Sequence, residues 1–356
     1  MPPKTPATNA PSVDISGLLD DLVPVDTRGI GIDIGTMGII SARRTPTNGI
    51  ETRRMRNAFL DLDPSARKML KLSGANFIER PDELLIVGDE ALAVANVFGK
   101  EARRPLQAGL LAAGEIDALE VLALMIKSVL GPPTVKNEVC YFCVPAAPVN
   151  APGTDVIYHK GVLDRIVTEC GYDAYAANEA MSILFSETAA EGFSGLSISF
   201  GSGMANCALA ISSLEGLSFS IQGCGDWIDQ GAARAVGSTA ARMCAIKESG
   251  FSLLDPHGRE EEALSLYYKS MIENCLDNVS QQFQLVKGKF AVPKPIPLVI
   301  AGGTSMAGGF KEFFEQVFNK KRRKFPIEIT EIRQARDPMN AVAQGLLLLA
   351  QQEYSD

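Results

Sequence analysis

The sequence predicts an α/β protein in which two similar lobes face each other across a cleft. A glycine-rich turn between two apolar runs occurs at residues 29–41 and again at residues 196–209, about half the chain apart. A third apolar run, at residues 297–301, ends in Gly302-Gly303 and precedes a segment with helical periodicity. One glycine turn alone indicates an ordinary hairpin, whereas two in matching contexts indicate a duplicated fold.

The first turn follows Asp33. Gly35 and Thr36 separate the apolar run before Asp33 from a second run that begins at Ile39, which predicts a β-hairpin. The backbone N–H groups of such a turn can surround an anion such as a phosphate. A carboxylate at the end of the strand suits a hydrated Mg²⁺ ion, which proteins hold with few carboxylates and with phosphates.

The second turn repeats the order strand, glycine turn, strand between Ser199 and Asn206. The third element, at residues 297–306, is expected to be a buried strand that ends in two glycines. Glycines there allow the backbone to approach a nucleoside. N–H groups at the beginning of the next helix, expected at about residues 309–318, would face an α-phosphate.

With these elements in this order, the chain resembles the actin-like ATPase superfamily, and most of all the bacterial actins of the MreB and MamK type. The elements correspond to the phosphate 1, phosphate 2 and adenosine motifs. Further stretches match in order at residues 87–91, 104–110, 143–146, 178–182 and 223–229. The resemblance runs from Gly29 to the C-terminus and implies the duplicated ribonuclease-H-like fold of actins and heat-shock ATPases.

The resemblance also implies a division of the chain. Domain I would comprise residues 28–195 and 336–356, with a small subdomain at about 50–84. Domain II would comprise residues 196–335, with a small subdomain at about 226–288. Residues 1–27 begin with a segment rich in Pro, Thr and Ala and are expected to form a disordered tail, although the acidic, apolar stretch at 13–23 offers a place for an adaptor or regulator to bind.

The resemblance implies ATP or ADP with Mg²⁺ between the lobes. Asp33 would hold the Mg²⁺ through water. The residues that it assigns to the nucleotide are Asp33, Gly35, Thr36, Met37, Gly201, Ser202, Gly203, Met204, Lys247, Glu248, Gly302, Gly303 and Thr304.

Glu179 is the catalytic residue that the resemblance implies, because hydrolysis needs a group that orients the attacking water. It would lie in a helix expected at about residues 175–190. By type alone, a Glu at this place is more often a partner of the helix dipole. Ser199 and Asn206 replace acidic residues of the family's phosphate 2 motif, which predicts weak hydrolysis with nucleotide binding retained. Asp226 is expected to shape its turn and to cap the next helix.

The function implied is that of a cytoplasmic, filament-forming prokaryotic actin whose polymerisation is controlled by its nucleotide, with slow hydrolysis. The altered phosphate 2 motif leaves a second function open, a monomeric actin-fold scaffold or pseudo-ATPase that docks on a partner complex. A metabolite kinase of the same superfold is disfavoured, because no candidate Asp is placed to activate an acceptor hydroxyl.

Composition sets further bounds. The chain has 356 residues, of which 46% are hydrophobic, enough for about two domains. Its formal net charge of −8 argues against general nucleic-acid binding.

Seven Cys without a recognisable signal peptide fit a reducing cytoplasm, and Cys140 and Cys143 are expected to be buried strand thiols. No apolar run suits a membrane span. The basic run at residues 320–324 is expected to be a solvated loop, with contact to an anionic membrane or an acidic protomer surface as the alternative.

Overall fold

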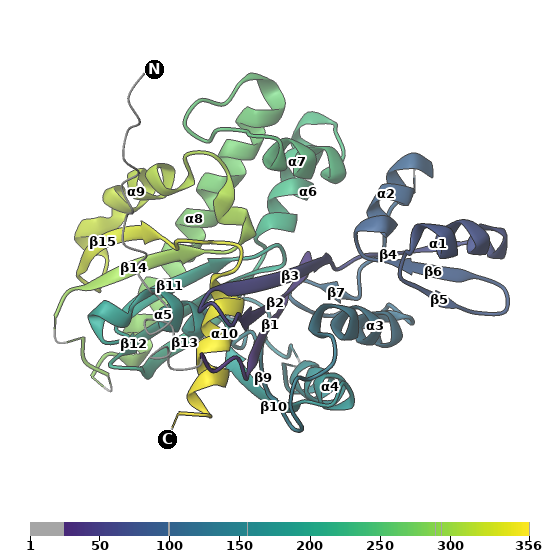
Figure 1. Cartoon of the computed structure of the whole chain (residues 1–356). Helices are drawn as coiled ribbons and strands as arrows, with labels where there is room; N and C mark the ends of the chain where they lie inside the picture. Colours follow the sequence, from purple (N-terminus) through teal and green to yellow (C-terminus); the bar gives the residue numbers. More distant parts are fainter. Residues whose placement is uncertain (1–24, 99, 155, 289, 293, 356) are drawn as a thin grey trace, which may run out of the picture.

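The computed structural model describes residues 25–98, 100–154, 156–288, 290–292 and 294–355 (Figure 1). Most of the expected tail, and the whole acidic stretch at 13–23, therefore lies outside the described residues. Two five-stranded sheets form the centre of the molecule, and a smaller sheet stands apart from them.

The first sheet consists of β1 (Ile30–Ile34), β2 (Gly38–Arg44), β3 (Ile50–Arg56), β9 (Val139–Val144) and β10 (Asp173–Asn178). Its strand order is β10-β9-β1-β2-β3. The strands β1, β2 and β3 are antiparallel, while β9 and β10 run parallel to β1.

The second sheet consists of β11 (Gly195–Phe200), β12 (Met204–Ile211), β13 (Leu214–Gln222), β14 (Ile296–Ala301) and β15 (Ile329–Gln334). Its order is β13-β12-β11-β14-β15, again three antiparallel strands followed by two parallel to the first. Because the order and the directions repeat, the predicted duplication is confirmed. Ser199 pairs with Asn206 in the second sheet as Asp33 pairs with Ile40 in the first.

Helices α3 (Ala118–Leu130), α4 (Val156–Glu169) and the C-terminal α10 (Ala341–Gln352) pack on the first sheet. Helix α5 (Glu179–Glu187) packs on α10 and mainly on β11 and β12 of the second sheet. Helix α10 crosses β1 so closely that a Cβ atom on Gly31 would lie 2.3 Å from the carbonyl oxygen of Ala343. This crossing brings the end of the chain against the strands that carry the first glycine turn.

The helices around the second sheet are α6 (Gly225–Val236), α7 (Ala240–Glu248), α8 (Gly258–Val286) and α9 (Phe310–Lys321), with the short helices η4 (Gly303–Met306) and η5 (Arg322–Lys324) nearby in sequence. The short helix η3 (Ala189–Glu191) follows α5. The core around the second sheet is aromatic. Phe200 of β11 packs edge-on against Phe310 and Phe314 of α9, and Tyr268 of α8 packs against Phe310. The core thus fixes the end of β11, where the second glycine turn begins.

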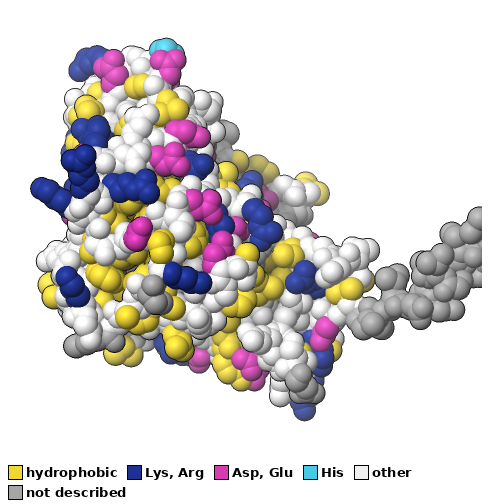
Figure 2. Space-filling view, turned by 90° about the vertical axis from the view of Figure 1, so that its left-hand side faces the viewer, with side chains coloured by type: hydrophobic (Ala, Val, Ile, Leu, Met, Phe, Trp, Pro, Cys, Tyr) yellow, Lys and Arg dark blue, Asp and Glu magenta, His cyan; other side chains and the backbone are white. Residues whose placement is uncertain are grey.

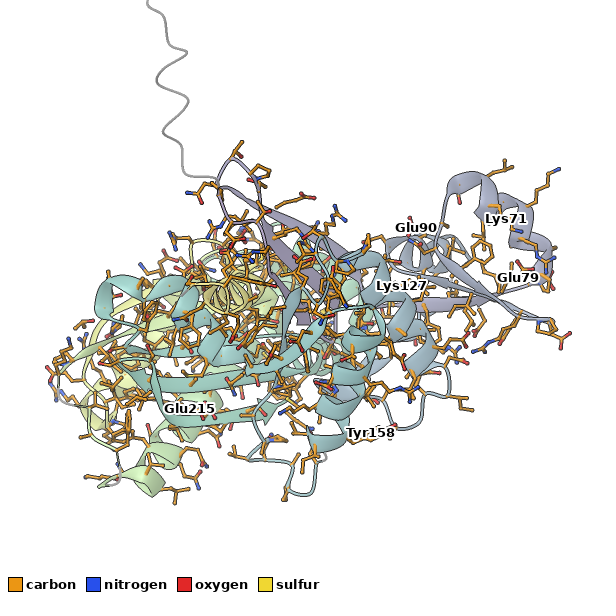
Figure 3. All side chains as sticks on the ribbon, turned by 60° about the horizontal axis from the view of Figure 1, so that its bottom comes forward. Lys71, Glu79, Glu90, Lys127, Tyr158 and Glu215 are labelled. Atoms are coloured by element: carbon orange, nitrogen blue, oxygen red, sulfur yellow. The ribbon has the colours of Figure 1, made fainter. Side chains whose placement is uncertain are left out.

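The small sheet has the order β4-β6-β5, with β4 (Phe59–Leu62), β5 (Phe77–Glu79) and β6 (Leu84–Val87). It carries η2 (Pro64–Ala66), α1 (Arg67–Ser73) and α2 (Asp89–Phe98), and the short hairpin β7 (Leu106–Gln107) and β8 (Leu110–Leu111) follows. Lys71 and Glu79 form an ion pair at 3.8 Å near its tip (Figure 3). Strand β3 pairs with β2 in the first sheet, so the part of the chain outside that sheet begins after Arg56.

Several elements differ from those expected. Residues 175–178 are not helical, because they belong to β10, which pairs with β9 along its whole length. The helix begins at Glu179, where the side chain of Asn178 accepts a hydrogen bond from the backbone N–H of Met181 at 3.1 Å. Strand β15 was not predicted.

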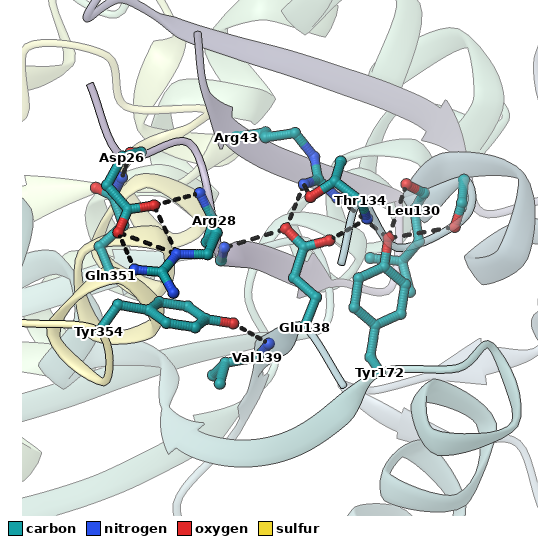
Figure 4. A network of polar contacts seen from close by, with 12 residues as sticks. Asp26, Arg28, Arg43, Leu130, Thr134, Glu138, Val139, Tyr172, Gln351 and Tyr354 are labelled. Atoms are coloured by element: carbon teal, nitrogen blue, oxygen red, sulfur yellow. Dashed lines mark hydrogen bonds and ion pairs between the residues drawn. The ribbon is translucent and has the colours of Figure 1, made fainter. Parts of the chain in front are cut away.

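A buried carboxylate ties the start of the described chain to the first sheet (Figure 4). Glu138 is fully buried. It accepts hydrogen bonds from the backbone N–H groups of Gly29 at 3.1 Å and Thr134 at 2.6 Å, and it pairs with Arg43. Next to it, the backbone N–H of Val139 donates to Tyr354 Oη at 2.8 Å. The segment at Gly29 and the residue Tyr354 are therefore both held against the first sheet.

The basic run is exposed at the end of α9, where Lys320, Arg322, Arg323 and Lys324 face solvent. Figure 2 views the side on which α9 and β15 lie, and Lys and Arg side chains gather on one flank of it. Within the described ranges, no helix is both long and apolar enough to cross a membrane. Cys140 and Cys143 are free and buried in β9, as predicted.

Candidate functional site

A cleft of about 470 Å³ lies between the two lobes. Every residue that the sequence assigned to the nucleotide or to catalysis lines it: Asp33, Gly35, Thr36, Met37, Glu179, Gly201, Ser202, Gly203, Met204, Lys247, Glu248, Gly302, Gly303 and Thr304. These residues come from both halves of the chain. Their assembly follows from the duplication, which brings corresponding turns of the two sheets together.

The first turn is held by backbone hydrogen bonds. The N–H of Gly35 donates to the carbonyl of Gly38 at 2.9 Å. Asn57, which follows β3, donates from Nδ2 to the carbonyl of Gly35 at 2.8 Å, and its backbone N–H donates to the carbonyl of Met37. The residue that follows β3 therefore fixes the first turn through two hydrogen bonds.

The second turn has a corresponding structure. The N–H of Gly201 donates to the carbonyl of Met204 at 3.0 Å. Thr304 of η4 donates from Oγ1 to the carbonyl of Gly201 at 2.7 Å, and the N–H of Gly225 donates to the same carbonyl at 3.2 Å. The third glycine segment and the beginning of α6 therefore both position the second turn.

The two turns approach each other at their tips. A Cβ atom on Gly203 would lie 2.7 Å from Thr36 Oγ1 and 2.3 Å from the backbone nitrogen of Gly109. That nitrogen donates to Thr36 Oγ1 at 3.0 Å. A side chain at Gly203 would therefore force the lobes apart, so glycine is required by contact at this position.

Gly302 is required for a different reason. Its φ of +91° lies in the region that L side chains rarely adopt, and a Cβ atom would lie 2.4 Å from the carbonyl oxygen of Phe200. Its N–H donates to the carbonyl of Pro338 at 2.8 Å. The chain thus turns sharply at the end of β14 and enters η4 directly at the cleft.

Glu179 is the first residue of α5, and its carboxylate is held by the two residues that depart from the family's motif. Asn206 Nδ2 donates to Glu179 Oε2 at 2.9 Å, and Ser199 also hydrogen-bonds to it. Burial raises the pKa of Glu179, and the nearby charge of Asp33 raises it further, while these two hydrogen bonds oppose the shift. Ser199 and Asn206 therefore hold the Glu179 carboxylate at the cleft by hydrogen bonds.

Asp33 shares this environment, where burial raises the pKa of its carboxyl as well. Cys143 Sγ donates to Asp33 Oδ1 at 3.0 Å and accepts from the backbone N–H of Ile34 at 3.3 Å. The thiol therefore orients the carboxylate from the adjacent strand β9.

Lys247 and Glu248 line the cleft with their charges already paired. Lys247 Nζ lies 2.8 Å from Asp229 Oδ1 and donates to the carbonyl of Gly225. Burial raises the pKa of Asp229 to about 6, and the charge of Lys247 opposes that rise. Glu248 accepts two hydrogen bonds of 3.0 Å from Arg56 Nη2, which comes from the opposite lobe.

Sequence reasoning missed the residues that support the site rather than line its turns. Asn57, Arg56 and Arg104 make their contacts with partners 22 to 192 positions away, and no local pattern marks them. Asp226 was expected to cap α6, but Cys224 precedes that helix without a side-chain cap. The carboxylate of Asp226 instead accepts from Ser202 and Arg104.

Solved structures with a similar fold are actin-like. A structure described as a MamK double helical filament has a TM-score of 0.68 and 18% identity, covering 91% of this chain and 98% of that one. MreB 5 of Spiroplasma citri bound to AMPPNP has a TM-score of 0.65 and 14% identity, covering 93% and 98%. The ethanolamine utilization protein EutJ from Carboxydothermus hydrogenoformans has a TM-score of 0.53 and 15% identity, covering 92% and 91%.

These likenesses confirm the predicted actin-like fold over more than nine tenths of the chain. No curated protein sequence matches it. The model of the family described as Volactin matches residues 29–350. The chain belongs to the Volactin family.

Proposed function

We propose that this protein binds ATP or ADP in its cleft and assembles head to tail into filaments under the control of the bound nucleotide. One observation carries the proposal. The two glycine turns and the Gly302-Gly303 segment, from different lobes, line one cleft of about 470 Å³. A ligand with both a phosphate chain and a nucleoside would use all three.

The glycine turns would hold the phosphates. Gly35, Thr36 and Met37 contribute from domain I, and Gly201, Ser202 and Gly203 contribute from domain II. Small turns present backbone N–H groups to anions. Because each turn belongs to a different lobe, a bound triphosphate ties the lobes together. Structures of similar fold bound to AMPPNP or ADP support a nucleotide in this fold.

Oxygen atoms of Asp33, beside the first turn, and of Asn206, on β12, suit Mg²⁺, which prefers hard oxygen ligands and keeps several waters. Asp33 supplies a carboxylate that Cys143 orients. The buried Asn206 Oδ1 has no hydrogen-bond partner within the described parts of the chain, so it can accept from a water of the hydrated ion. When bound, Mg²⁺ neutralises phosphate charge.

Glu179 would orient the water that attacks the terminal phosphate, since it is the carboxylate that Ser199 and Asn206 hold toward the cleft. Neither Ser199 nor Asn206 supplies a carboxylate of its own to the cleft. We therefore expect slow hydrolysis. Filaments should then be long-lived, because loss of the γ-phosphate would loosen the connection between the two lobes.

The same substitutions favour a second candidate, a monomeric actin-fold scaffold or pseudo-ATPase that docks on a partner complex. In that case the cleft would bind nucleotide for structural reasons, and turnover would have no role. The two candidates differ in assembly, because a heterologous head-to-tail contact does not close and produces filaments.

Pelleting at high speed with ATP, with ADP and without nucleotide separates them, with phosphate release followed in the same samples. Pelleting that depends on ATP supports the filament, and the phosphate trace gives the rate of hydrolysis. Nucleotide binding without pelleting under any condition supports the scaffold. A protein that neither binds nucleotide nor pellets contradicts both. The cytoplasm remains the proposed compartment, in agreement with seven free cysteines.

A further inference from the structure

Ser202, at the tip of the second turn, makes a hydrogen bond that bears on nucleotide recognition. Its Oγ donates to Asp226 Oδ1 at 2.5 Å, while the backbone N–H of Asp226 donates to the carbonyl of Ser202 at 2.8 Å. These two contacts fix the serine against the first turn of α6. They place its hydroxyl at the edge of the phosphate side of the cleft.

A serine hydroxyl has one proton to donate. While Ser202 donates to Asp226, its Oγ offers only lone pairs to a phosphate oxygen, and two acceptors repel each other. To donate to a phosphate, the hydroxyl must leave Asp226. The hydroxyl can therefore donate either to the carboxylate of Asp226 or to an anion in the cleft, but not to both at once.

The same carboxylate joins the lobes. Arg104, which precedes the β7–β8 hairpin of domain I, donates from Nη1 to both oxygens of Asp226, at 2.9 and 3.0 Å. The ion pair is partly shielded, since the side chains are 34% and 24% exposed. A carboxylate that loses the hydrogen bond from Ser202 interacts more strongly with its remaining cationic partner.

We propose that Ser202 senses the terminal phosphate of a triphosphate, and that Asp226 is a positioning residue that passes this change to Arg104. The inference rests on the proposed nucleotide site and deepens it. With a diphosphate the hydroxyl stays on Asp226. With a triphosphate it turns to the γ-phosphate, and the Arg104–Asp226 contact tightens and holds the hairpin against domain II.

Binding of AMPPNP and of ADP by the full-length chain tests the sensor. Ser202→Ala removes a hydrogen bond to a charged group, so AMPPNP should bind about tenfold more weakly, while ADP binding stays within about twofold. Ser202→Thr keeps the hydroxyl and should restore the ratio of the two affinities. Ser218→Ala is the matched control, because Ser218 also donates to a carboxylate, that of the exposed Glu215.

Hydrogen exchange of the backbone at residues 104–111 tests the coupling. AMPPNP should protect this segment more than ADP does, and Arg104→Gln should abolish that difference. Arg242→Gln, which breaks the exposed ion pair with Glu260, should preserve it.

The inference would be overturned if Ser202→Ala left the ratio of the AMPPNP and ADP affinities unchanged, whether both affinities fell equally or neither fell. Failure of the wild-type chain to bind either nucleotide would instead refute the proposed function, and the inference with it. Wild-type binding with no effect of Ser202 refutes the inference alone.

Discussion

At the scale of single residues, the cleft depends on how one carboxylate is held. Ser199 takes the place in the second sheet that Asp33 takes in the first, as the strand registers show. Its hydroxyl and the amide of Asn206 both bond to Glu179. A motif that lacks its usual acidic residues therefore still presents an acidic group, supplied by the helix that follows β10.

Replacing Glu179 by Gln should separate binding from hydrolysis. Gln keeps the size and an acceptor for Asn206, so AMPPNP affinity should change little, while phosphate release should fall by about a hundredfold because the water-orienting base is lost. Single-turnover phosphate release measures the effect. Glu215→Gln is the control, since Glu215 is an exposed residue of β13 that does not line the cleft (Figure 3). Unchanged release in Glu179→Gln would remove Glu179 from the mechanism.

The sequence predicted these residues to different degrees. Asp33 and the glycines of the turns stand in local patterns, so neighbouring positions alone identified them. Cys143 was predicted to be buried in a strand, but its bond to Asp33 depends on the pairing of β9 with β1. Arg104 and Asp226 meet only because the two lobes fold against each other, and no local pattern carries that information.

At the scale of elements, the crossing of α10 over α5 is the tightest contact that glycine permits in the described structure. A Cβ atom on Gly345 would lie 1.8 Å from the carbonyl oxygen of Ser182. Because Ser182 belongs to the helix that begins with Glu179, this crossing also fixes the candidate catalytic residue. The abundance of small residues in the last helix reflects that contact.

Gly345→Ala should therefore lower the free energy of unfolding by about 3 kcal/mol, because backbone atoms have no space to yield. Gly161→Ala should raise it by about 0.5 to 1 kcal/mol, since Gly161 lies in the exposed middle of α4 with no atom near its missing Cβ, and Ala is the better helix former. Chemical denaturation of both variants measures the two effects. A loss of stability in both would show that the crossing is not the cause.

Helix α4 also carries a buried titratable group. His159 is 2% exposed, and burial lowers the pKa of its ring from 6.5 to about 4. The unfolded chain then binds more protons between these values, so the free energy of unfolding should fall by about 3 kcal/mol as the pH drops from 6.5 to 4. Denaturation across this range should show a smaller drop in His159→Leu. His257→Leu, at an exposed site, should keep the full drop.

The elements differ in how well their sequences predicted them. The three strands that lead into the cleft were predicted because glycine turns bound them. Residues 175–178 of β10 were taken for helix, since they continue directly into α5. The edge strand β15 is stabilised mainly by pairing with β14, which is a tertiary contact that its own residues do not indicate.

At the scale of the whole molecule, an ion pair joins the two lobes across the cleft. Arg56 of β3 and Glu248 of α7 form a two-point ion pair there, and both side chains line the cleft. We expect this pair to open when the proposed nucleotide enters or leaves beside it. It is 32% exposed at Arg56 and 51% at Glu248, so its free energy is about 1 kcal/mol or less.

A double-mutant cycle on this pair should change the rate at which nucleotide leaves. Arg56→Ala and Glu248→Ala should each speed the release of a fluorescent AMPPNP analogue by up to about fivefold, and added salt should have less effect on them than on wild type. Because each side chain also lines the cleft, the double mutant is needed, and it should release nucleotide no faster than the quicker single mutant. If the two increases in release rate multiply in the double mutant, Arg56 and Glu248 act on the nucleotide separately. The lobes are then held closed by the phosphate turns alone.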